Sequence, residues 1–351
     1  MAVTVNEQNY VLSVSNLRKR FNLEAGFFAR FGRFVHAVNG VSFSIGRNET
    51  YGLVGESGCG KSTTARLIVR MYEANEGDIV FRGPDGFVVD ARKVKGQDFR
   101  RYREKVKYVF QDPAKSLNPR MSIFEVLTSG AKWSTEKRDS TILRREAADI
   151  LEEVGLSAKD LERRPAEFSG GQRQRISIAR GLIMKPNVLI CDEVVSALDV
   201  SIQGQILNLL LDLRNHRRSS GQEISYIFIA HNLKVACYFC DRIGVMYRGE
   251  IMEEAPAQEL WKQDAGKGHP YTELLFSSVN DVQGKLQSKV IQGEVKSVKS
   301  ESPDLVVSGC AFSHRCPYSD DVCVKENPPL LEVGPEHRIR CWKRPPPTSG
   351  V

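Results

Sequence analysis

The sequence predicts an α/β protein whose core is a parallel β-sheet covered by helices. Three short apolar runs support this prediction. They end at Val54, Ile190 and Ala230, and glycine, acidic or histidine residues follow each of them closely. Continuous apolar runs of this kind are typical of parallel strands that are buried on both faces. Between the first and second runs, stretches such as LRREAADILEEVGL have the spacing of amphipathic helices, which indicates a helical segment.

The composition is typical of a globular protein that stays inside the cell. The chain has 351 residues, of which 41% are hydrophobic and 26% charged. No apolar run approaches the ~18–20 residues of a membrane span, and the N-terminus lacks the features of a secretory signal. The net charge of +7 comes from scattered Lys and Arg, which favours a solvated surface over a nucleic-acid site. In a reducing cytoplasm, eight cysteines indicate buried thiols or metal ligands rather than disulfides.

The residues after the first run fit the motif G-x-x-x-x-G-K-[ST], with Gly55, Gly60, Lys61 and Ser62 at the defining positions. Glycines allow successive backbone N–H groups to face phosphate oxygens, and the following helix presents its positive end to the same anion. Lys61 can reach the β- and γ-phosphates, and the Ser62 hydroxyl can ligate Mg²⁺. A glycine-rich turn without a ligand is the alternative, but the strand–loop–helix context favours a nucleotide site.

Acidic residues follow the second run, and a histidine follows the third. Asp192 is suited to a water-bridged Mg²⁺ at the carboxyl end of a strand, and the adjacent Glu193 to polarising the attacking water. His231 ends the third run, where a γ-phosphate sensor would lie if the strands are parallel. Each has a structural alternative: an exposed acidic turn for the carboxylates and a packing role for the histidine.

A second glycine turn, FSGGQ, opens a helix at Ser169, Gly170, Gly171 and Gln172. It lacks the lysine of a phosphate loop, yet its backbone and helix N-terminus can receive an anion. Taken alone, the turn is better explained as a helix cap, because serine is a common N-cap residue.

The order of these motifs, from the phosphate loop through FSGGQ and LICDE to the strand ending in histidine, resembles the ATPase subunit of ABC transporters. The resemblance runs from about Leu12 to Glu254. It implies a P-loop ABC ATPase core with an N-terminal antiparallel β part and a helical subdomain. It also implies that two such subunits meet head to tail around two ATP molecules. The FSGGQ turn then serves the nucleotide of the other subunit, which explains a glycine turn without a lysine.

The resemblance also implies roles for individual residues. Those implied to bind ATP are Gly55, Ser57, Gly58, Gly60, Lys61, Ser62 and Thr63, with Phe21 (or Phe34) stacked on the adenine. Those implied to hold Mg²⁺ are Ser62, Gln111 and Asp192. Catalytic roles are implied for Glu193, His231 and Gln111, and communication across the dimer for Asp199.

Two further stretches, QDPAKSLNPRM and GHPYTELL, resemble the oligopeptide and dipeptide importer branch, which includes nickel importers. ICDEVVSALDVSIQ and the insert before AVNGVSF are similar to the second of the two unlike ATPases of these importers. The implied partners are a paralogous ATPase in a heterodimer, two membrane permeases and an extracytoplasmic binding protein. The chain would then be peripheral, at the cytoplasmic face of the inner membrane. Val194 departs from the family pattern, which usually has proline after the catalytic glutamate.

The resemblance and the composition together predict the domain organisation. Residues 1–112 and 187–263 form the nucleotide-binding α/β core, and residues 113–186 form the helical subdomain with the FSGGQ turn. A polar, Ser/Lys-rich linker spans 264–301, and a four-cysteine domain spans 302–351.

The cysteines of the last segment, Cys310, Cys316, Cys323 and Cys341, have the spacing C-x5-C-x6-C-x17-C. Zinc knuckles usually have closer pairs, whereas irregular spacing suits an iron–sulfur cluster as well, so spacing alone leaves a cluster, zinc or free thiols open. The segment resembles the C-terminal tail of the same importer branch. That resemblance implies a four-iron four-sulfur (4Fe–4S) cluster that acts as a structural staple.

Two rival functions come from other classes. A soluble ABC ATPase that acts on nucleic acid or ribosomes commonly has two cassettes or a long coiled coil, whereas this chain has one cassette and no sustained heptads. A subunit of a phosphonate-degrading complex is the second rival. We therefore expect an ATP-hydrolysing subunit that energises import of peptides or related solutes, with no nucleic-acid partner.

Overall fold

The computed structural model describes residues 9–22, 34–135, 138–262, 267–280, 298–300 and 308–344. The chain forms two compact units. Unit 1 comprises Met1–Ser13, Ser44–Thr50 and Ile79–Ile229, and unit 2 comprises Val14–Phe43, Tyr51–Asp78 and Ala230–Val351. No helix in the described ranges is both long and apolar enough to cross a membrane.

The sheet of unit 1 contains the second and third predicted strands. β7 (Val188–Asp192) pairs in parallel with β6 (Val106–Val109) on one side and with β8 (Ser225–Ala230) on the other. All residues of β7 and β8 are buried, which explains their continuous apolar sequence. The parallel prediction is therefore confirmed for these strands. A separate antiparallel pair joins β4 (Glu76–Arg82) to β5 (Val88–Asp90).

Helices make up most of unit 1 between residues 113 and 182. They are α3 (Pro113–Ser116), α4 (Ile123–Thr128), α5 (Ser140–Glu153) and α6 (Gly170–Leu182), with short 3-10 helices η3 (Ala131–Trp133), η4 (Ala158–Glu162) and η5 (Pro165–Glu167). α2 (Gly96–Lys105) precedes β6, and α7 (Val200–Ser219) follows β7. Apolar residues at helical spacing, such as Ala147, Ile150 and Leu151 of α5, are buried, so packing of one face stabilises these helices.

Unit 2 contains the strand before the phosphate loop. β3 (Thr50–Val54) pairs in parallel with β9 (Arg242–Tyr247), and β9 pairs antiparallel with β10 (Glu250–Pro256). β13 (His337–Ile339) and β12 (Leu331–Gly334) continue the sheet beyond β10. β2 (Phe34–Gly46) lies between β1 (Tyr10–Asn22) and the antiparallel β11 (Val298–Ser300). The helices are α1 (Lys61–Ile68), α8 (Leu233–Phe239), α9 (Ala257–Lys262), α10 (Pro270–Asn280), η7 (Ser313–Arg315) and α11 (Asp321–Lys325).

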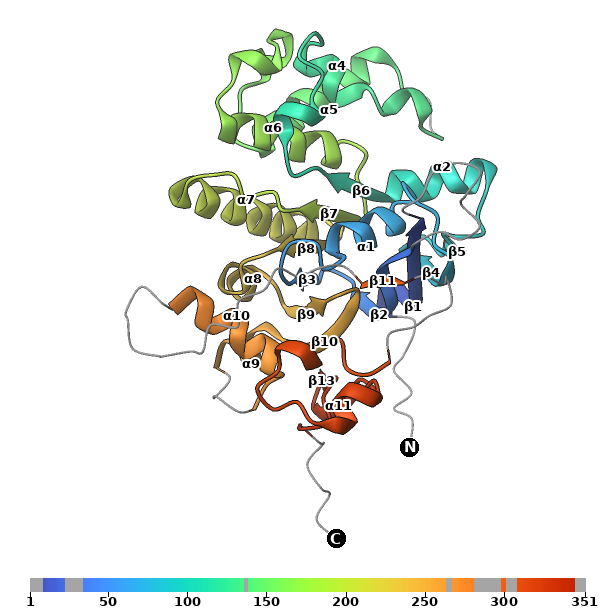
Figure 1. The fold of residues 1–351 in the computed structure, drawn as a ribbon. Coiled ribbons are helices and arrows are strands. Elements are labelled where there is room, and N and C mark those ends of the chain that lie inside the picture. The colour runs from blue at the N-terminus through green and yellow to red at the C-terminus, as the bar shows by residue number, and fades with distance from the viewer. Residues whose placement is uncertain are drawn as a thin grey trace. The chain divides into compact units, whose positions relative to one another are not determined.

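Buried carboxylates on β10 attach the C-terminal segment 308–344 to the rest of unit 2. Glu254 is fully buried and pairs with Arg338 of β13 and with Arg242 of β9. Glu253, also fully buried, lies 2.8 Å from Nε2 of His337. The red C-terminal elements accordingly lie beside β10 (Figure 1). The segment predicted as the four-cysteine domain, 302–351, thus belongs to the same compact unit as the phosphate loop.

The predicted linker range 264–301 differs from the structure at its beginning, because α10 forms there. Tyr271 and Thr272 of α10 are fully buried, so this helix packs as part of unit 2. The polar composition that predicted a linker begins only at Asn280. β11 (Val298–Ser300) also falls within the predicted linker. The linker residues 264–266, 281–297 and 301 lie outside the described residues, as do 23–33 of the insert before AVNGVSF.

Candidate functional site

The phosphate loop joins β3 to α1, as the sequence predicts. All five residues of β3 are buried, and α1 begins at Lys61. Two glycines of the loop lie against other backbone segments. A Cβ on Gly55 would lie 2.1 Å from the Met246 carbonyl oxygen, and one on Gly60 would lie 2.3 Å from that of Ala37. The close packing of this loop therefore requires glycine at both positions.

Lys61 is buried and its ammonium group points back into the loop. Its Nζ donates hydrogen bonds to the carbonyl oxygens of Gly55 (2.7 Å) and Glu56 (2.9 Å). The N-terminus of α1 has no side-chain cap, because Gly60 is the N-cap residue. A cation and a helix N-terminus therefore occur together in this loop, and both attract phosphate.

The other predicted residues of unit 2 lie at the surface or near it. Phe21 is half-buried and packs edge-on against Tyr72, with ring centroids 5.4 Å apart. The Nζ of Lys19 lies 5.0 Å from the centre of the Phe21 ring. His231 is exposed and follows β8 directly, before α8, which Asn232 caps. Phe34 is half-buried, at the first position of β2.

In unit 1, Asp192 is the last residue of β7 and is 2% exposed. The hydroxyl of Tyr108, on the adjacent strand β6, donates a hydrogen bond to its carboxylate. The sequence analysis missed Tyr108. Its contact with Asp192 depends on the pairing of β6 with β7, which the sequence does not reveal. The only signal in the sequence is that Tyr108 lies three residues before Gln111.

Glu193 lies in the turn after β7, with a φ of 47°, in the left-handed region. Its N–H donates to the carbonyl of Ile229 (3.1 Å), and Nε2 of Gln111 donates to its carboxylate (2.8 Å). The structure therefore brings together two of the predicted catalytic residues. Val194, the departure from the family pattern, is 1% exposed, so its side chain packs inside.

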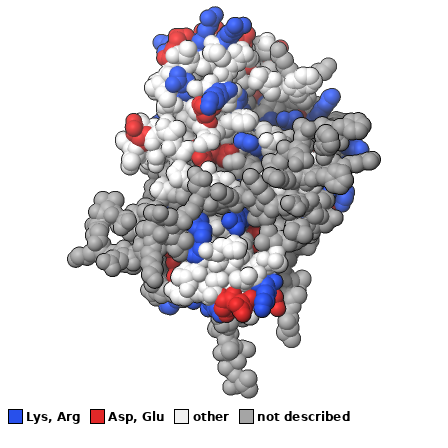
Figure 2. Space-filling view, in the orientation of Figure 1, with Lys and Arg blue, Asp and Glu red and all other residues white. Residues whose placement is uncertain are grey.

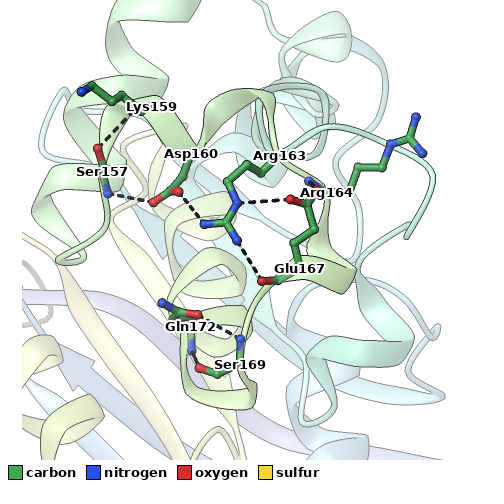
Figure 3. A network of polar contacts seen from close by, with 8 residues as sticks. All are labelled: Ser157, Lys159, Asp160, Arg163, Arg164, Glu167, Ser169 and Gln172. Atoms are coloured by element: carbon green, nitrogen blue, oxygen red, sulfur yellow. Dashed lines mark hydrogen bonds and ion pairs between the residues drawn. The ribbon is translucent and has the colours of Figure 1, made fainter.

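The FSGGQ turn forms the helix cap that the sequence analysis preferred. Ser169 caps α6: its Oγ accepts from the Gln172 N–H (3.3 Å), and Gln172 Oε1 accepts from the Ser169 N–H (2.9 Å). The preceding loop is tied by Arg163, which donates to Asp160 (2.9 Å) and Glu167 (3.3 Å) (Figure 3). Gly170 is exposed. Apart from its chain neighbours and the backbone of its own helix, no heavy atom of the described residues lies within 4 Å of where its Cβ would be.

Asp199 is the N-cap residue of α7 and is exposed. Its side chain makes no capping hydrogen bond. The remaining predicted loop residues, Ser57 and Gly58, are exposed, whereas Ser62 and Thr63 of α1 are half-buried.

The four C-terminal cysteines all carry free thiols, of which Cys310, Cys323 and Cys341 are buried. Burial, with smaller contributions from the other three thiols, raises the pKa of Cys310 to about 11. The donor set is soft, but its geometry does not fit a metal: among the described residues, no group of three or more His, Cys, Asp or Glu could hold an ion. The predicted 4Fe–4S cluster therefore has no support from this structure.

The comparisons with known proteins agree with this geometry. The family described as "ABC transporter" matches residues 38–196, and "Oligopeptide/dipeptide transporter, C-terminal region" matches 252–323. The oligopeptide transport ATP-binding protein AppF of Bacillus subtilis is 39% identical, over 97% of this chain and 99% of its own length. OppF of Haemophilus influenzae is 38% identical, over 96% of this chain and 98% of its own length.

Solved structures show the same fold. CbiO1 from Clostridium perfringens, part of the transporter complex cbiONQ, is 26% identical with a TM-score of 0.59, over 73% of this chain and 92% of its own. The ATP-binding cassette MJ0796, solved as a dimer bound to ADP and Pi, is 24% identical with a TM-score of 0.58, over 70% of this chain and 98% of its own.

The chain is therefore a P-loop ABC ATPase with an N-terminal antiparallel β part. More particularly, it belongs to the ATP-binding proteins of the oligopeptide and dipeptide transporter branch, which confirms the predicted family.

Proposed function

We propose that this ABC ATPase hydrolyses ATP to drive the import of peptides or related solutes across the inner membrane. The observation that carries the proposal is the hydrogen bond from Gln111 to Glu193 at the end of β7. Glu193 is the candidate base for ATP hydrolysis in this ABC family, and the bond holds its carboxylate in position. The relatives at 38–40% identity are named for oligopeptide and peptide transport, which supports peptides as the substrate class.

In this proposal, each motif has one task. Lys61 and the loop amides bind the phosphates, and Phe21 stacks on the adenine. Ser62, Asp192 and Gln111 would hold Mg²⁺, which would supply positive charge to neutralise the phosphates. Glu193 polarises the attacking water, and His231 contacts the γ-phosphate. Positioning and charge stabilisation supply most of the catalysis of phosphoryl transfer.

The FSGGQ turn would serve the nucleotide of a second, paralogous ATPase. The open space around Gly170 supports this, because the fold itself does not require a glycine there. Two permeases and an extracytoplasmic binding protein would complete the importer, with this subunit at the cytoplasmic face and Asp199 at the contact with the paralogue.

The soluble alternatives find no support among the relatives, which are named for transport. Figure 2 shows basic and acidic side chains interspersed among the described residues of the visible face.

The proposed chemistry assigns no step to the four cysteines. Iron, zinc and sulfide analysis of the full-length protein, purified without oxygen, tests the cluster that the family resemblance implies. About four irons with acid-labile sulfide would establish a cluster, and absence of metal would leave four thiols.

Replacement of Glu193 tests the proposed function. We expect Glu193→Gln to bind ATP as wild type does but to hydrolyse it at least roughly 100-fold more slowly, because the water loses its polarising carboxylate. The closed dimer with the paralogue should accumulate, which size-exclusion chromatography with ATP detects. Turnover close to wild type would overturn the assignment.

A further inference from the structure

The C-terminal segment contacts the phosphate loop through an ion pair. Nη1 of Arg315 donates to both carboxylate oxygens of Glu56, at 3.1 and 3.0 Å. Glu56 is the residue after Gly55 in the phosphate loop, and Arg315 lies in η7, next to Cys316. The pair is largely shielded from water, because the side chains are only 14% and 28% exposed. A contact between residues 259 positions apart therefore links the cysteine segment to the nucleotide motif.

The same loop residue is held at its backbone. The N–H of Glu56 donates to the hydroxyl of Tyr271 in α10 (2.9 Å). Its carbonyl accepts from Lys61 Nζ (2.9 Å). Tyr271 is fully buried, so its hydroxyl is a rigid partner. Glu56 is thus bound at its N–H, its carbonyl and its side chain, and two of these three contacts come from residues beyond 267.

Arg315 is itself held in place by aromatic rings. Its guanidinium carbon lies 5.7 Å from the centre of the Tyr247 ring and 5.9 Å from that of Phe312. Phe312 is buried and packs against Tyr247 and Tyr271. Burial alone would lower the pKa of Arg315, but the hydrogen bond to Glu56 keeps it above the usual value. The guanidinium therefore stays charged in a fixed position.

We propose that Arg315 is a positioning residue for nucleotide binding, which it supports by neutralising Glu56 and holding the phosphate loop in shape. The inference rests on the proposed binding of ATP phosphates by this loop. Without Arg315, the Glu56 carboxylate would face an incoming triphosphate uncompensated, and like charges repel strongly where water is scarce. The loop backbone would also lose one of its anchors, so its amides would be less well preorganised for phosphate.

The test is the Kd of a fluorescent ATP analogue with Mg²⁺, measured on the full-length chain. We expect Arg315→Ala to raise the Kd by roughly tenfold, the effect of losing one charge-assisted hydrogen bond. Arg315→Lys should recover part of the affinity, because it restores the charge but not the planar guanidinium that packs beside Tyr247 and Phe312. Glu56→Gln combined with Arg315→Ala should recover most of it, because the uncompensated carboxylate is gone.

A matched control comes from the same segment. Arg344 is also half-buried, lies over Tyr318 and pairs with Glu273 (3.6 Å), away from Glu56. Arg344→Ala should leave the Kd within about twofold of wild type, because the loop keeps its anchor. An equal loss of affinity in both arginine variants would show general loosening of the segment and would overturn the proposal.

Lys61→Ala separates this inference from the proposed function. If Lys61→Ala binds the analogue normally, the phosphate loop is not the nucleotide site and the proposed function fails. If Lys61→Ala loses binding but Arg315→Ala keeps wild-type affinity, only the inference fails. If Arg315→Ala does not fold, as judged by its thermal transition, Arg315→Lys carries the same test. In the assembled transporter, the Arg315→Ala substitution should raise the KM for ATP and leave kcat within about twofold of the wild-type value.

Discussion

Among single residues, the two adjacent acids at the end of β7 have different surroundings. Asp192 is 2% exposed and accepts a hydrogen bond from Tyr108, whereas Glu193 is half-buried, in a left-handed turn and bound by Gln111. A buried carboxylate with a fixed donor is suited to holding a cation at one position. A half-buried carboxylate beside an amide is suited to contact with water. The environments thus agree with the two roles proposed for them.

Replacement of Tyr108 tests how much its hydrogen bond to Asp192 contributes to stability. Tyr108→Phe should lower the free energy of unfolding by about 2 kcal/mol, because a nearly buried carboxylate loses a charge-assisted hydrogen bond. The matched control is Tyr226→Phe, whose hydroxyl donates to a neutral acceptor, the carbonyl of Leu210 (3.1 Å). Tyr226→Phe should lower the free energy of unfolding by only about 1 kcal/mol. Urea unfolding of both variants measures the difference, and equal costs would contradict the special role of Tyr108.

At the scale of elements, the first turn of α6 combines a structural cap with an exposed surface. The capping box between Ser169 and Gln172 satisfies the helix end, so the cap that sequence reasoning preferred is real. The same turn carries Gly170, whose missing side chain has no internal explanation. Gly171 differs, because a Cβ there would lie 3.0 Å from Ile202 Cγ2. One glycine serves packing, and the other is available for a partner.

Alanine substitutions separate these two glycines. Gly170→Ala should leave stability unchanged or raise it by about 0.5–1 kcal/mol, since alanine is the better helix former. It should nevertheless reduce ATP hydrolysis by the assembled transporter at least roughly tenfold, because a methyl group would block the nucleotide of the paralogue. Gly171→Ala should instead lower the melting temperature. Full activity of Gly170→Ala would contradict the proposed role of the turn.

At the scale of the whole molecule, unit 2 buries a histidine at the beginning of α10. Burial lowers the pKa of His269 from its ordinary 6.5 to about 4, although Glu253 acts in the opposite direction. Its Nδ1 accepts the Tyr271 N–H (3.0 Å), which requires an unprotonated nitrogen. Below pH 6.5, the unfolded chain binds a proton that the folded chain does not, so stability falls as the pH falls.

The pH dependence of unfolding tests whether His269 is neutral in the folded chain. Between pH 7 and pH 4, the wild type should lose about 3 kcal/mol more stability than His269→Gln, because only the wild type has this histidine to protonate on unfolding. Denaturant titrations at several pH values measure the difference. His216→Gln, a change at an exposed histidine of α7, should parallel the wild type. Identical slopes for wild type and His269→Gln would show that His269 is not held neutral.

The motifs, the parallel strands and the family could be predicted from the sequence. A phosphate loop, a capped glycine turn and a buried strand depend on the spacing of near neighbours, which is visible along the chain. The four cysteines show the limit of this reasoning. Their spacing left a cluster, zinc or free thiols open, and only the family resemblance implied a cluster. Ligation depends on where the thiols point, and the described residues form no group that could hold a metal ion.

The contacts between residues far apart in the sequence could not be predicted in this way. Tyr108 reaches Asp192 across 84 positions because β6 and β7 pair in one register, and Arg315 reaches Glu56 across 259. The sequence around Tyr108 and Arg315 has no periodic pattern from which their partners could be predicted. Such contacts depend on strand order and on how the C-terminal segment packs on β10, and both arise from burial of many residues at once.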